Sequence, residues 1–248
     1  MTLLTEKFQY TLLQRQNSNG QRNYLCPDGS VVPSVTTILS ATKSEKDIAA
    51  LKAWEDKEGP EKAKQIKEEA AARGTRMHKF LEDYVTNGSL SEPGSNPYSK
   101  QGHLMASSII TEGFPNINEI WGSEVGVYYP GLYSGTADAV GMHSGREAVF
   151  DYKQSNKPKK EEWIEDYFLQ LTAYSIAHNK VYGTNIKKGV ILMCVKPEES
   201  SPGIWKEPLY QEFILHPHNF SYWENKWWDR VDRKSTRLNS SHIPLSRM

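Results

Sequence analysis

Two aspartates and a lysine occupy the two strands of a predicted β-hairpin in the segment YSGTADAVGMHSGREAVFDYK. If residues 144–145 form a two-residue turn, counting outward from it places Asp138 directly opposite Asp151. Lys153 returns to the same face because side chains alternate along a strand. Two directly opposed side chains start only about 5 Å apart, and like charges there repel each other unless a cation compensates them.

This set of side chains suits an oxygen-liganded divalent cation such as Mg²⁺ or Mn²⁺, with the lysine ammonium aimed at a bound water or a phosphate. The pattern therefore favours hydrolysis of a phosphodiester. The alternative is an exposed hairpin on which Lys153 only neutralises two surface acids, and the D…DxK spacing alone does not exclude it.

Two further pairs of polar side chains lie four residues apart, the spacing that brings side chains together on one face of a helix. In the first pair, Glu82 can orient the His78 imidazole while the other ring nitrogen of His78 faces a metal. In the second, Gln170 and Tyr174 offer neutral groups suited to phosphate or base edges. The alternatives are a surface helix contact and a helix face packed on a sheet.

The chain has 30 basic and 30 acidic residues, so the basic surface of a general nucleic-acid binder is missing and binding would have to use local patches. Cys26 and Cys194 lie far apart without CxxC spacing, which argues against a zinc site, an iron–sulfur cluster or a disulfide framework. No apolar stretch approaches the about 20 residues that span a membrane. The first residues lack the pattern of a targeting peptide, so we expect a cytoplasmic protein.

The order of elements predicts an α/β sandwich around a central mixed sheet. Residues 8–32 alternate apolar and polar residues around turn clusters at 17–20 and 27–30, which predicts a small antiparallel β-unit. Ser44 and Pro60 mark the starts of two helices. The predicted elements are helices at 45–58, 60–85 and 98–111, strands at 117–129, 133–142 and 147–153, a helix at 159–181, strands at 188–195 and 209–215, and a helix at 220–228.

The helix at 159–181 should lie across the sheet because it carries an apolar stripe at Trp163, Tyr167, Leu171, Tyr174 and Ala177. Residues 1–231 are interpreted as a single domain, with an N-terminal β and helical elaboration at about 1–115 and a core at about 116–231. Residues 232–242 can be read codon by codon as one frame of a common sequencing adapter, so 232–248 is interpreted as a non-native tail. A disordered polar terminus is the alternative.

Four short motifs occur in the order and approximate spacing of the RecB-like nucleases of the PD-(D/E)XK superfamily. They are GT-x-x-H at 74–78, GTAD at 135–138, DYK at 151–153 and Q-x-x-x-Y at 170–174. PSVTTIL at 33–39, followed by a charged helix and ARGT, resembles mitochondrial genome maintenance exonucleases and their bacterial and phage relatives. That family acts on DNA ends and prefers single strands.

The resemblance implies a restriction-endonuclease-like core with an N-terminal elaboration, and an Mg²⁺ or Mn²⁺ site. The metal ligands that it implies are His78, Asp138 and Asp151, with the Tyr152 carbonyl and Glu124 as further candidates. It makes Lys153 the catalytic lysine and gives Gln170 and Tyr174 supporting roles. Ala137 replaces the proline of the superfamily name, and the absence of a four-cysteine set argues against the iron–sulfur branches.

A DNA strand is expected to meet local basic and polar groups. The candidates are Arg73, Thr75, Arg76 and Lys79 around the histidine and Lys157, Lys159 and Lys160 beyond the catalytic strand. Unpaired bases could stack on Tyr128, Tyr129, Tyr133 and Trp163, although aromatic residues at these spacings also suit a core. By resemblance, the charged helices before His78 form an arch for single strands, and a solvated helical face is the alternative.

The sequence thus predicts a metal-dependent DNA exonuclease that prefers single-stranded ends, in a bacterial or phage-infected cytoplasm. An endonuclease of the same fold and a catalytically inactive nucleic-acid-binding module are the alternatives.

Overall fold

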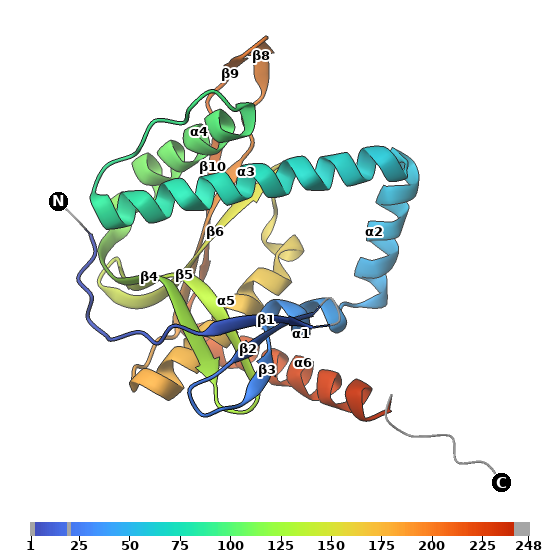
Figure 1. Cartoon of the computed structure of the whole chain (residues 1–248), viewed down its shortest axis with the longest axis vertical. Helices are drawn as coiled ribbons and strands as arrows, with labels where there is room; N and C mark the ends of the chain where they lie inside the picture. The colour runs from blue at the N-terminus through green and yellow to red at the C-terminus, as the bar shows by residue number, and fades with distance from the viewer. Residues whose placement is uncertain (1–2, 19–20, 241–248) are drawn as a thin grey trace.

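The centre of the protein is a five-stranded sheet, which a computed structural model describes within residues 3–18 and 21–240 (Figure 1). The strand order is β10-β7-β6-β5-β4, and every neighbouring pair is antiparallel except the parallel pair β6–β7. The strands are β4 (Ile117–Tyr129), β5 (Tyr133–His143), β6 (Arg146–Ser155), β7 (Lys188–Val195) and β10 (Leu209–Leu215). The predicted mixed sheet flanked by helices is confirmed.

The hairpin between β5 and β6 has the predicted two-residue turn. His143 pairs with Arg146 across it, and Ser144 and Gly145 both have positive φ angles, 48° and 74°. Two consecutive positive φ angles define the tight turn whose twist matches that of the flanking strands. The register that brings Asp138 towards Asp151 is therefore set by this turn.

Helices cover both faces of the sheet. On one face lie α3 (Pro60–Asn87) and α4 (Pro97–Glu112), which bury Met77, Leu81 and Met105 against Phe150 and Leu192 of the sheet. On the other face lies α5 (Glu165–Tyr182), with α1 (Val35–Ala41) and α6 (Phe220–Ser240) packed on it. The sheet thus has a separate apolar core on each side.

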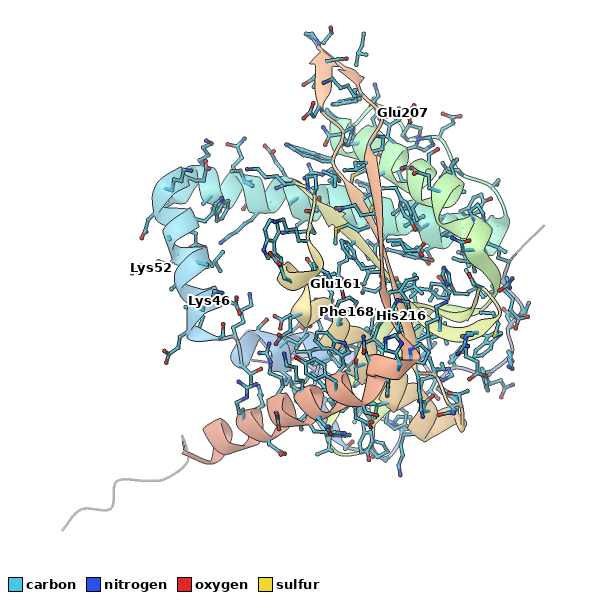
Figure 2. The ribbon with its side chains drawn as sticks, turned by 180° about the vertical axis from the view of Figure 1, so that it is seen from behind. Lys46, Lys52, Glu161, Phe168, Glu207 and His216 are labelled. Atoms are coloured by element: carbon cyan, nitrogen blue, oxygen red, sulfur yellow. The ribbon has the colours of Figure 1, made fainter. Side chains whose placement is uncertain are left out.

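The helix α2 (Glu45–Glu58) joins α1 to α3 and has no buried residue. It begins at the predicted cap, because the Ser44 side chain accepts a hydrogen bond from the Asp47 N–H. Figures 1 and 2 show α2, with Lys46 and Lys52, standing apart from the sheet. The next helix starts at Pro60 and ends before Gly88, whose φ of 73° provides the left-handed cap.

The predicted helix at 159–181 begins later than expected. Residues Glu161–Trp163 form a 3₁₀ turn, and α5 starts at Glu165. Trp163 is 59% exposed, so its assignment to the buried stripe was wrong, whereas Leu171, Tyr174 and Ala177 are buried. Trp163 has the right spacing from Tyr167 for a helical stripe. Its backbone, however, belongs to the 3₁₀ turn that precedes α5.

The N-terminal β-unit is present as β1 (Gln14–Ser18), β2 (Gln21–Leu25) and β3 (Val31–Pro33). The turn predicted at 17–20 includes residues 19–20, which lie outside the described residues. The unit meets the central sheet through a bridge between Ser34 and Ser134. It is therefore tied to β5 at the residue just before the GTAD motif.

Two features depart from or extend the predicted elements. A small hairpin, β8 (Glu199–Ser201) and β9 (Ile204–Trp205), precedes β10 and was not predicted. The final helix α6 extends past 228 to Ser240, through the first part of the tail predicted at 232–248, and residues 241–248 lie outside the described residues. The non-native origin of the tail stays a prediction.

Within residues 3–18 and 21–240, none of the helices combines the length and apolarity that crossing a membrane requires.

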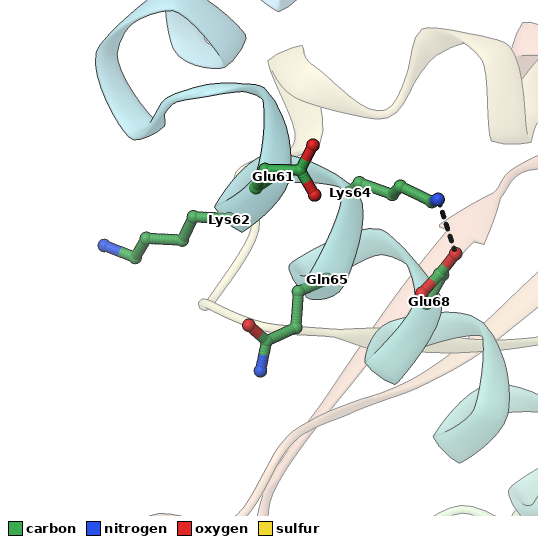
Figure 3. Close-up of a pocket in the computed structure, with 5 residues that line it drawn as sticks. All are labelled: Glu61, Lys62, Lys64, Gln65 and Glu68. Carbon is green, nitrogen blue, oxygen red and sulfur yellow. Dashed lines mark ion pairs between the residues drawn. The ribbon is translucent and has the colours of Figure 1, made fainter.

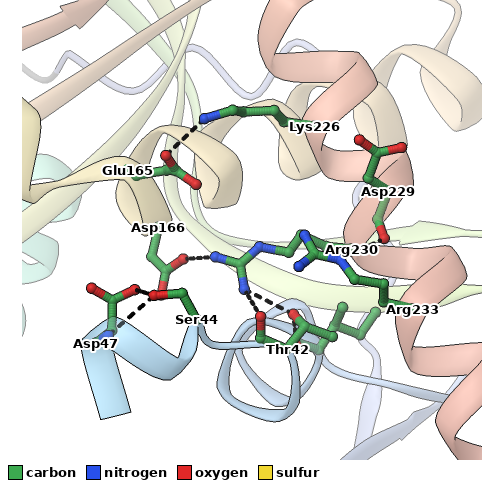
Figure 4. A network of polar contacts seen from close by, with 10 residues as sticks. Thr42, Ser44, Asp47, Glu165, Asp166, Lys226, Asp229, Arg230 and Arg233 are labelled. Atoms are coloured by element: carbon green, nitrogen blue, oxygen red, sulfur yellow. Dashed lines mark hydrogen bonds and ion pairs between the residues drawn. The ribbon is translucent and has the colours of Figure 1, made fainter. Parts of the chain in front are cut away.

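A buried arginine ties together three elements at the junction of α1, α5 and α6 (Figure 4). Arg230 of α6 donates hydrogen bonds to the backbone carbonyl and the hydroxyl of Thr42 and forms an ion pair with Asp166 of α5. Its side chain is only 6% exposed. The pairing fixes the start of α5 relative to the connection between α1 and α2.

We expect Arg230→Met to lower the free energy of unfolding by about 2–3 kcal/mol, because Asp166 and the Thr42 carbonyl lose their charged partner. Arg233→Met is the matched control, since the Arg233 side chain is exposed and donates a hydrogen bond to the Asp229 carbonyl of its own helix. It should change stability by less than about 0.5 kcal/mol. Urea unfolding of both variants measures the difference, and equal effects would contradict this role for Arg230.

Candidate active site

A cleft of about 420 Å³ opens where β4, β5 and β6 meet α3, α5 and the N-terminal β-unit. It gathers side chains that are distant in the sequence, from Leu13 to Tyr174. The predicted residues that line it are His78, Glu124, Asp138, Asp151, Lys153, Gln170 and Tyr174. The two aspartates and Lys153 therefore face the same cleft, as the hairpin register predicted.

Asp138 lies where β5 and β6 separate. The last paired residues of the two strands are Ala139 and Phe150. Beyond them the Asp138 carboxylate accepts a hydrogen bond from the Tyr152 N–H at 2.6 Å. The other carboxylate oxygen lies 3.4 Å from Nδ1 of His78. Burial would raise the pKa of Asp138, but His78, Lys153 and the Tyr152 N–H together lower it.

Glu124 reaches the same point from β4. The pairs Ser123–Ala139 and Val125–Ala137 place Glu124 opposite Asp138, and its φ of 51° lies in the left-handed region that a glutamate rarely adopts. Burial and the Asp138 charge raise the pKa of Glu124 to about 7. Strained backbone and a perturbed carboxyl group in one residue are typical of functional sites.

His78, Glu124 and Asp138 form a potential metal centre, because one ligand atom from each lies within 4.8 Å of the others. Imidazole nitrogen and carboxylate oxygen suit a transition-metal ion or Mg²⁺ with retained water ligands. The raised pKa of His78 reflects Asp138, whose charge outweighs the effect of burial. The donor set fits a divalent cation. The cation would replace the proton on His78 as the positive charge that balances Asp138.

Asp151 and Lys153 form an adjacent pair. Lys153 Nζ lies 2.5 Å from one oxygen of Asp151, and Gln170 donates a hydrogen bond to the other at 3.0 Å. Burial and the nearby Asp138 raise the pKa of Asp151 to about 6, against the opposing effect of Lys153. Burial would lower the pKa of Lys153, but Asp151 and Asp138 raise it, so Lys153 stays charged.

The Q-x-x-x-Y motif holds this pair from α5. Gln170 also donates to the Tyr174 hydroxyl at 3.2 Å, and a Cβ on Gly135 would lie 2.6 Å from the Tyr174 ring. The glycine of GTAD is therefore required for the close approach of α5 to β5. These contacts orient the Asp151 carboxylate, which in turn orients Lys153.

Tyr152 contributes through its backbone. Its side chain is buried in the core beneath α3 and α4, on the opposite side of the strand. Its N–H points to Asp138, and the carbonyl of a strand residue points to the same edge as its N–H. The Tyr152 carbonyl is thus directed towards the separated edge of β6, where a metal ligand is expected.

Several predicted contacts are absent. Glu82 contacts Lys79 at 3.3 Å rather than orienting His78. Lys79 also pairs with Asp83. Arg73 is buried and donates to Gln101, Gln154 and Asn156, which corrects its assignment to the DNA surface. Its position in the α3–α4 contact explains why spacing alone misplaced it.

The remaining candidates for DNA contact lie outside the cleft. Thr75, Arg76 and Lys157 are exposed. Among the aromatic candidates, Tyr133 is core: it is fully buried, packs on Trp227 and donates its hydroxyl hydrogen to the Ala173 carbonyl. Tyr129 packs on Trp228. Tyr128 is partly exposed, and the exposed Trp163 lies beside Lys160.

Sequence reasoning missed part of the cleft. Arg15, Arg22 and Thr36 line it from the N-terminal β-unit and α1, and Thr136 lines it from within the GTAD motif. The two arginines come together only through the pairing of β1 with β2. The signal available in the sequence was the alternation of residues on both sides of the predicted turn at 17–20, which indicates two paired strands that carry Arg15 and Arg22.

Comparisons with known proteins find three similar curated sequences, each named mitochondrial genome maintenance exonuclease 1. The human protein is 24% identical over 230 residues, covering 86% of this chain and 61% of the relative. The Xenopus tropicalis protein is 28% identical over 225 residues, covering 85% and 59%. The mouse protein is 25% identical over 222 residues, covering 86% and 62%. These relatives support a nuclease family for this chain.

The chain spans about three fifths of the length of these relatives. No protein-family model matches it. The match to a crystal structure of SSO0001 covers 70% of this chain and 96% of the SSO0001 chain at 15% identity. Its TM-score of 0.26 is too low to support a shared fold. The three relatives are vertebrate proteins, so the expected bacterial or phage setting has no support from them.

The raised pKa values of Glu124 and Asp151 predict a pH-dependent stability in metal-free protein. Their carboxyl groups keep protons in the folded state that the unfolded chain releases near pH 4. Their contribution to stability is therefore present at low pH and is lost as the pH rises from about 4 through about 7. Glu124→Gln should reduce this loss.

Chemical unfolding in EDTA at pH 5 and pH 8 measures the effect, with Glu147→Gln as a control that removes a carboxylate outside the cleft. The difference in unfolding free energy between Glu124→Gln and the unmodified protein should move in favour of the variant as the pH rises. Parallel pH profiles for the two proteins would contradict the proposed crowding of negative charge.

Proposed function

We propose that this chain is a metal-dependent DNA exonuclease of the RecB-like branch of the PD-(D/E)XK superfamily, acting on single-stranded ends. The observation that carries the proposal is the meeting of a His-Glu-Asp ligand group and the Asp151–Lys153 pair in one cleft. The three relatives named as exonucleases support a nuclease function. The preference for single strands rests on the family resemblance.

His78, Glu124 and Asp138 would hold an Mg²⁺ or Mn²⁺ ion, and Asp151 with the Tyr152 carbonyl would border it. When bound, the cation supplies a lower pKa for a coordinated water and polarises a phosphate oxygen. The imidazole of His78 favours Mn²⁺ relative to an all-oxygen site. Asp151, a ligand by the family resemblance, would border the cation while its contact with Lys153 is kept.

The side chains of the cleft divide the remaining work. Lys153 is charged and is held by Asp151 at 2.5 Å, so its ammonium stabilises negative charge that develops on the phosphate. Gln170 and Tyr174 keep Asp151 in one orientation. Fixing a charged group before reaction avoids the cost of reorienting it in the transition state.

The arrangement of α2 with the first part of α3 suits the expected passage for a single strand. The α2 helix has no buried residue, and Figure 1 shows it and the start of α3 clear of the sheet. The passage of a single strand beneath these helices stays a proposal that rests on the family resemblance.

The proposal is tested with single-stranded DNA labelled at either end, incubated with Mg²⁺, Mn²⁺ or EDTA. We expect loss of label from an end only when a divalent cation is present. Circular single-stranded DNA should remain whole, since an exonuclease needs an end. Cleavage of the circle would identify an endonuclease, and an absence of cleavage with both cations would favour an inactive binding module.

Lys153→Ala should reduce the cleavage rate by about 10²–10³-fold, the usual effect of losing one group that stabilises transition-state charge. Folding should be retained because the side chain lies at the cleft surface. Lys187→Ala, at an exposed position before β7 that does not line the cleft, is the control and should keep its rate. Near-normal turnover in Lys153→Ala would remove this residue from the catalytic machinery.

Asp138→Asn should weaken Mn²⁺ binding about tenfold or more, because the ligand group loses its central charge. Calorimetric titration of metal-free protein with Mn²⁺ measures the affinity without requiring activity. Asp28→Asn, on an exposed turn of the β-unit, is the matched control. Unchanged affinity in Asp138→Asn would exclude Asp138 as a ligand.

A further inference from the structure

A second hollow continues the cleft across the N-terminal β-unit. Arg15, Arg22 and Thr36 line both the cleft and this hollow, which has a volume of about 610 Å³. Its other lining residues are Asn17, Thr37, Ser40 and Ala41. Because three residues are shared, a polar groove leads from the metal ligands over β1, β2 and α1. We call it the Arg15–Arg22 groove.

The pairing of β1 with β2 places both arginines on one side of the ribbon. Arg15 pairs with Tyr24, and Asn17 pairs with Arg22. Since alternate residues of a strand share a face and paired residues share it too, these four side chains lie together. The groove therefore follows from strand register.

Main-chain contacts fix this ribbon against α1. The Arg22 carbonyl accepts hydrogen bonds from the Ser34 N–H at 2.9 Å and the Thr37 hydroxyl at 3.0 Å. Ser34 also bridges to Ser134 in β5. The backbone that carries Arg22 is thus connected to the strand that carries Asp138, so the groove and the cleft form one built surface.

In the 610 Å³ hollow of the groove, no acidic residue of the lining balances the positive charge. Its lining contains two arginines and no acidic side chain. Within residues 3–18 and 21–240, neither arginine forms an ion pair, and Arg15 has only a 3.4 Å contact with the Asn17 amide oxygen. Lys79 and Arg230, in contrast, are paired with carboxylates.

Other hollows do not share this character. One on α3 mixes lysines with glutamates, and its Lys64 lies 4.0 Å from Glu68 (Figure 3). Another, between α2, α5 and α6, contains as many acidic as basic side chains, and Arg230 there is already bound to Asp166 (Figure 4). In a chain with no net charge, the Arg15–Arg22 groove stands out as a local anion site next to the ligand group.

We propose that the Arg15–Arg22 groove binds the phosphodiester backbone of the DNA strand next to the bond that is cut. The proposal rests on the proposed nuclease function. Guanidinium groups make paired hydrogen bonds to phosphate oxygens, and the hydroxyls of Thr36, Thr37 and Ser40 add donors along the same path. Contacts to phosphate position the strand without selecting its sequence.

The first test measures binding of a labelled single-stranded oligonucleotide by fluorescence anisotropy in EDTA, where cleavage is blocked. Arg15→Ala/Arg22→Ala should weaken binding and lower the slope of log affinity against log salt by about 1.4, or about 0.7 for each lost phosphate contact. Lys187→Ala/Lys206→Ala removes two exposed charges that line neither the groove nor the cleft, and it is the matched control. Equal salt slopes in the two double variants would overturn the proposal.

The second test removes the charge from the ligand. Uncharged methylphosphonate linkages near the ends of the oligonucleotide should weaken binding to the unmodified protein, but should weaken binding to Arg15→Ala/Arg22→Ala much less. Independent, additive losses would show that the arginines do not contact those phosphates. Arg15→Lys/Arg22→Lys should recover most of the salt dependence, and thermal unfolding confirms that the variants remain folded.

Cleavage assays keep this inference separate from the proposed function. If the unmodified protein cleaves DNA with Mn²⁺ while Arg15→Ala/Arg22→Ala binds normally, the nuclease function stands and the groove assignment fails. If no cleavage occurs yet binding depends on the two arginines and on phosphate charge, the groove assignment stands and the nuclease function fails. With both intact, the double variant should show a raised KM and a nearly unchanged kcat.

Discussion

The separation of β5 from β6 is the constraint on which the candidate site depends. The strands remain paired as far as Ala139 and Phe150, and beyond that point the Asp138 carboxylate takes the hydrogen bond of the Tyr152 N–H. A side chain thus replaces a main-chain acceptor, which satisfies the freed N–H and leaves the edge of β6 open. The opening brings Asp138, Asp151 and Lys153 to a shared cleft instead of a continuous sheet surface.

The second constraint is the crowding of negative charge in that opening. Glu124, Asp138 and Asp151 all lie in the cleft, and the pKa values of Glu124 and Asp151 are raised to about 7 and about 6. His78 contacts Asp138 and Lys153 contacts Asp151, whereas Glu124 has no ion pair among the described residues. Because these carboxyl groups take up protons when no cation is present, binding of a divalent cation at this site would depend on pH.

The elements around the sheet bring further side chains to the cleft. The α3 helix carries His78 over the end of β6, and its buried face packs on α4 and the sheet. The β-unit is tied to β5 by Ser34 and Ser134 and supplies two arginines without carboxylate partners among the described residues. The candidate ligand group and the two arginines beside it thus come from different parts of the chain. The relatives, which cover most of this chain at 24–28% identity, support the nuclease interpretation of that combination.

The sequence by itself determined the local structure of this protein. Alternation and turn residues located β4, β7 and β10 at their observed bounds, and the 144–145 turn set the register of Asp138, Asp151 and Lys153, because these signals depend on neighbouring residues. The Gln170–Tyr174 pair followed from helical spacing in the same way.

Tertiary structure decided the contacts between distant segments. It buried Arg73 among Gln101, Gln154 and Asn156, exposed Trp163 and brought Glu124 into the ligand group with His78. It also placed Arg15 and Arg22 beside that group. Local periodicity records which side of an element a residue occupies, but the partner that covers that side depends on how helices and strands pack, which no local pattern encodes.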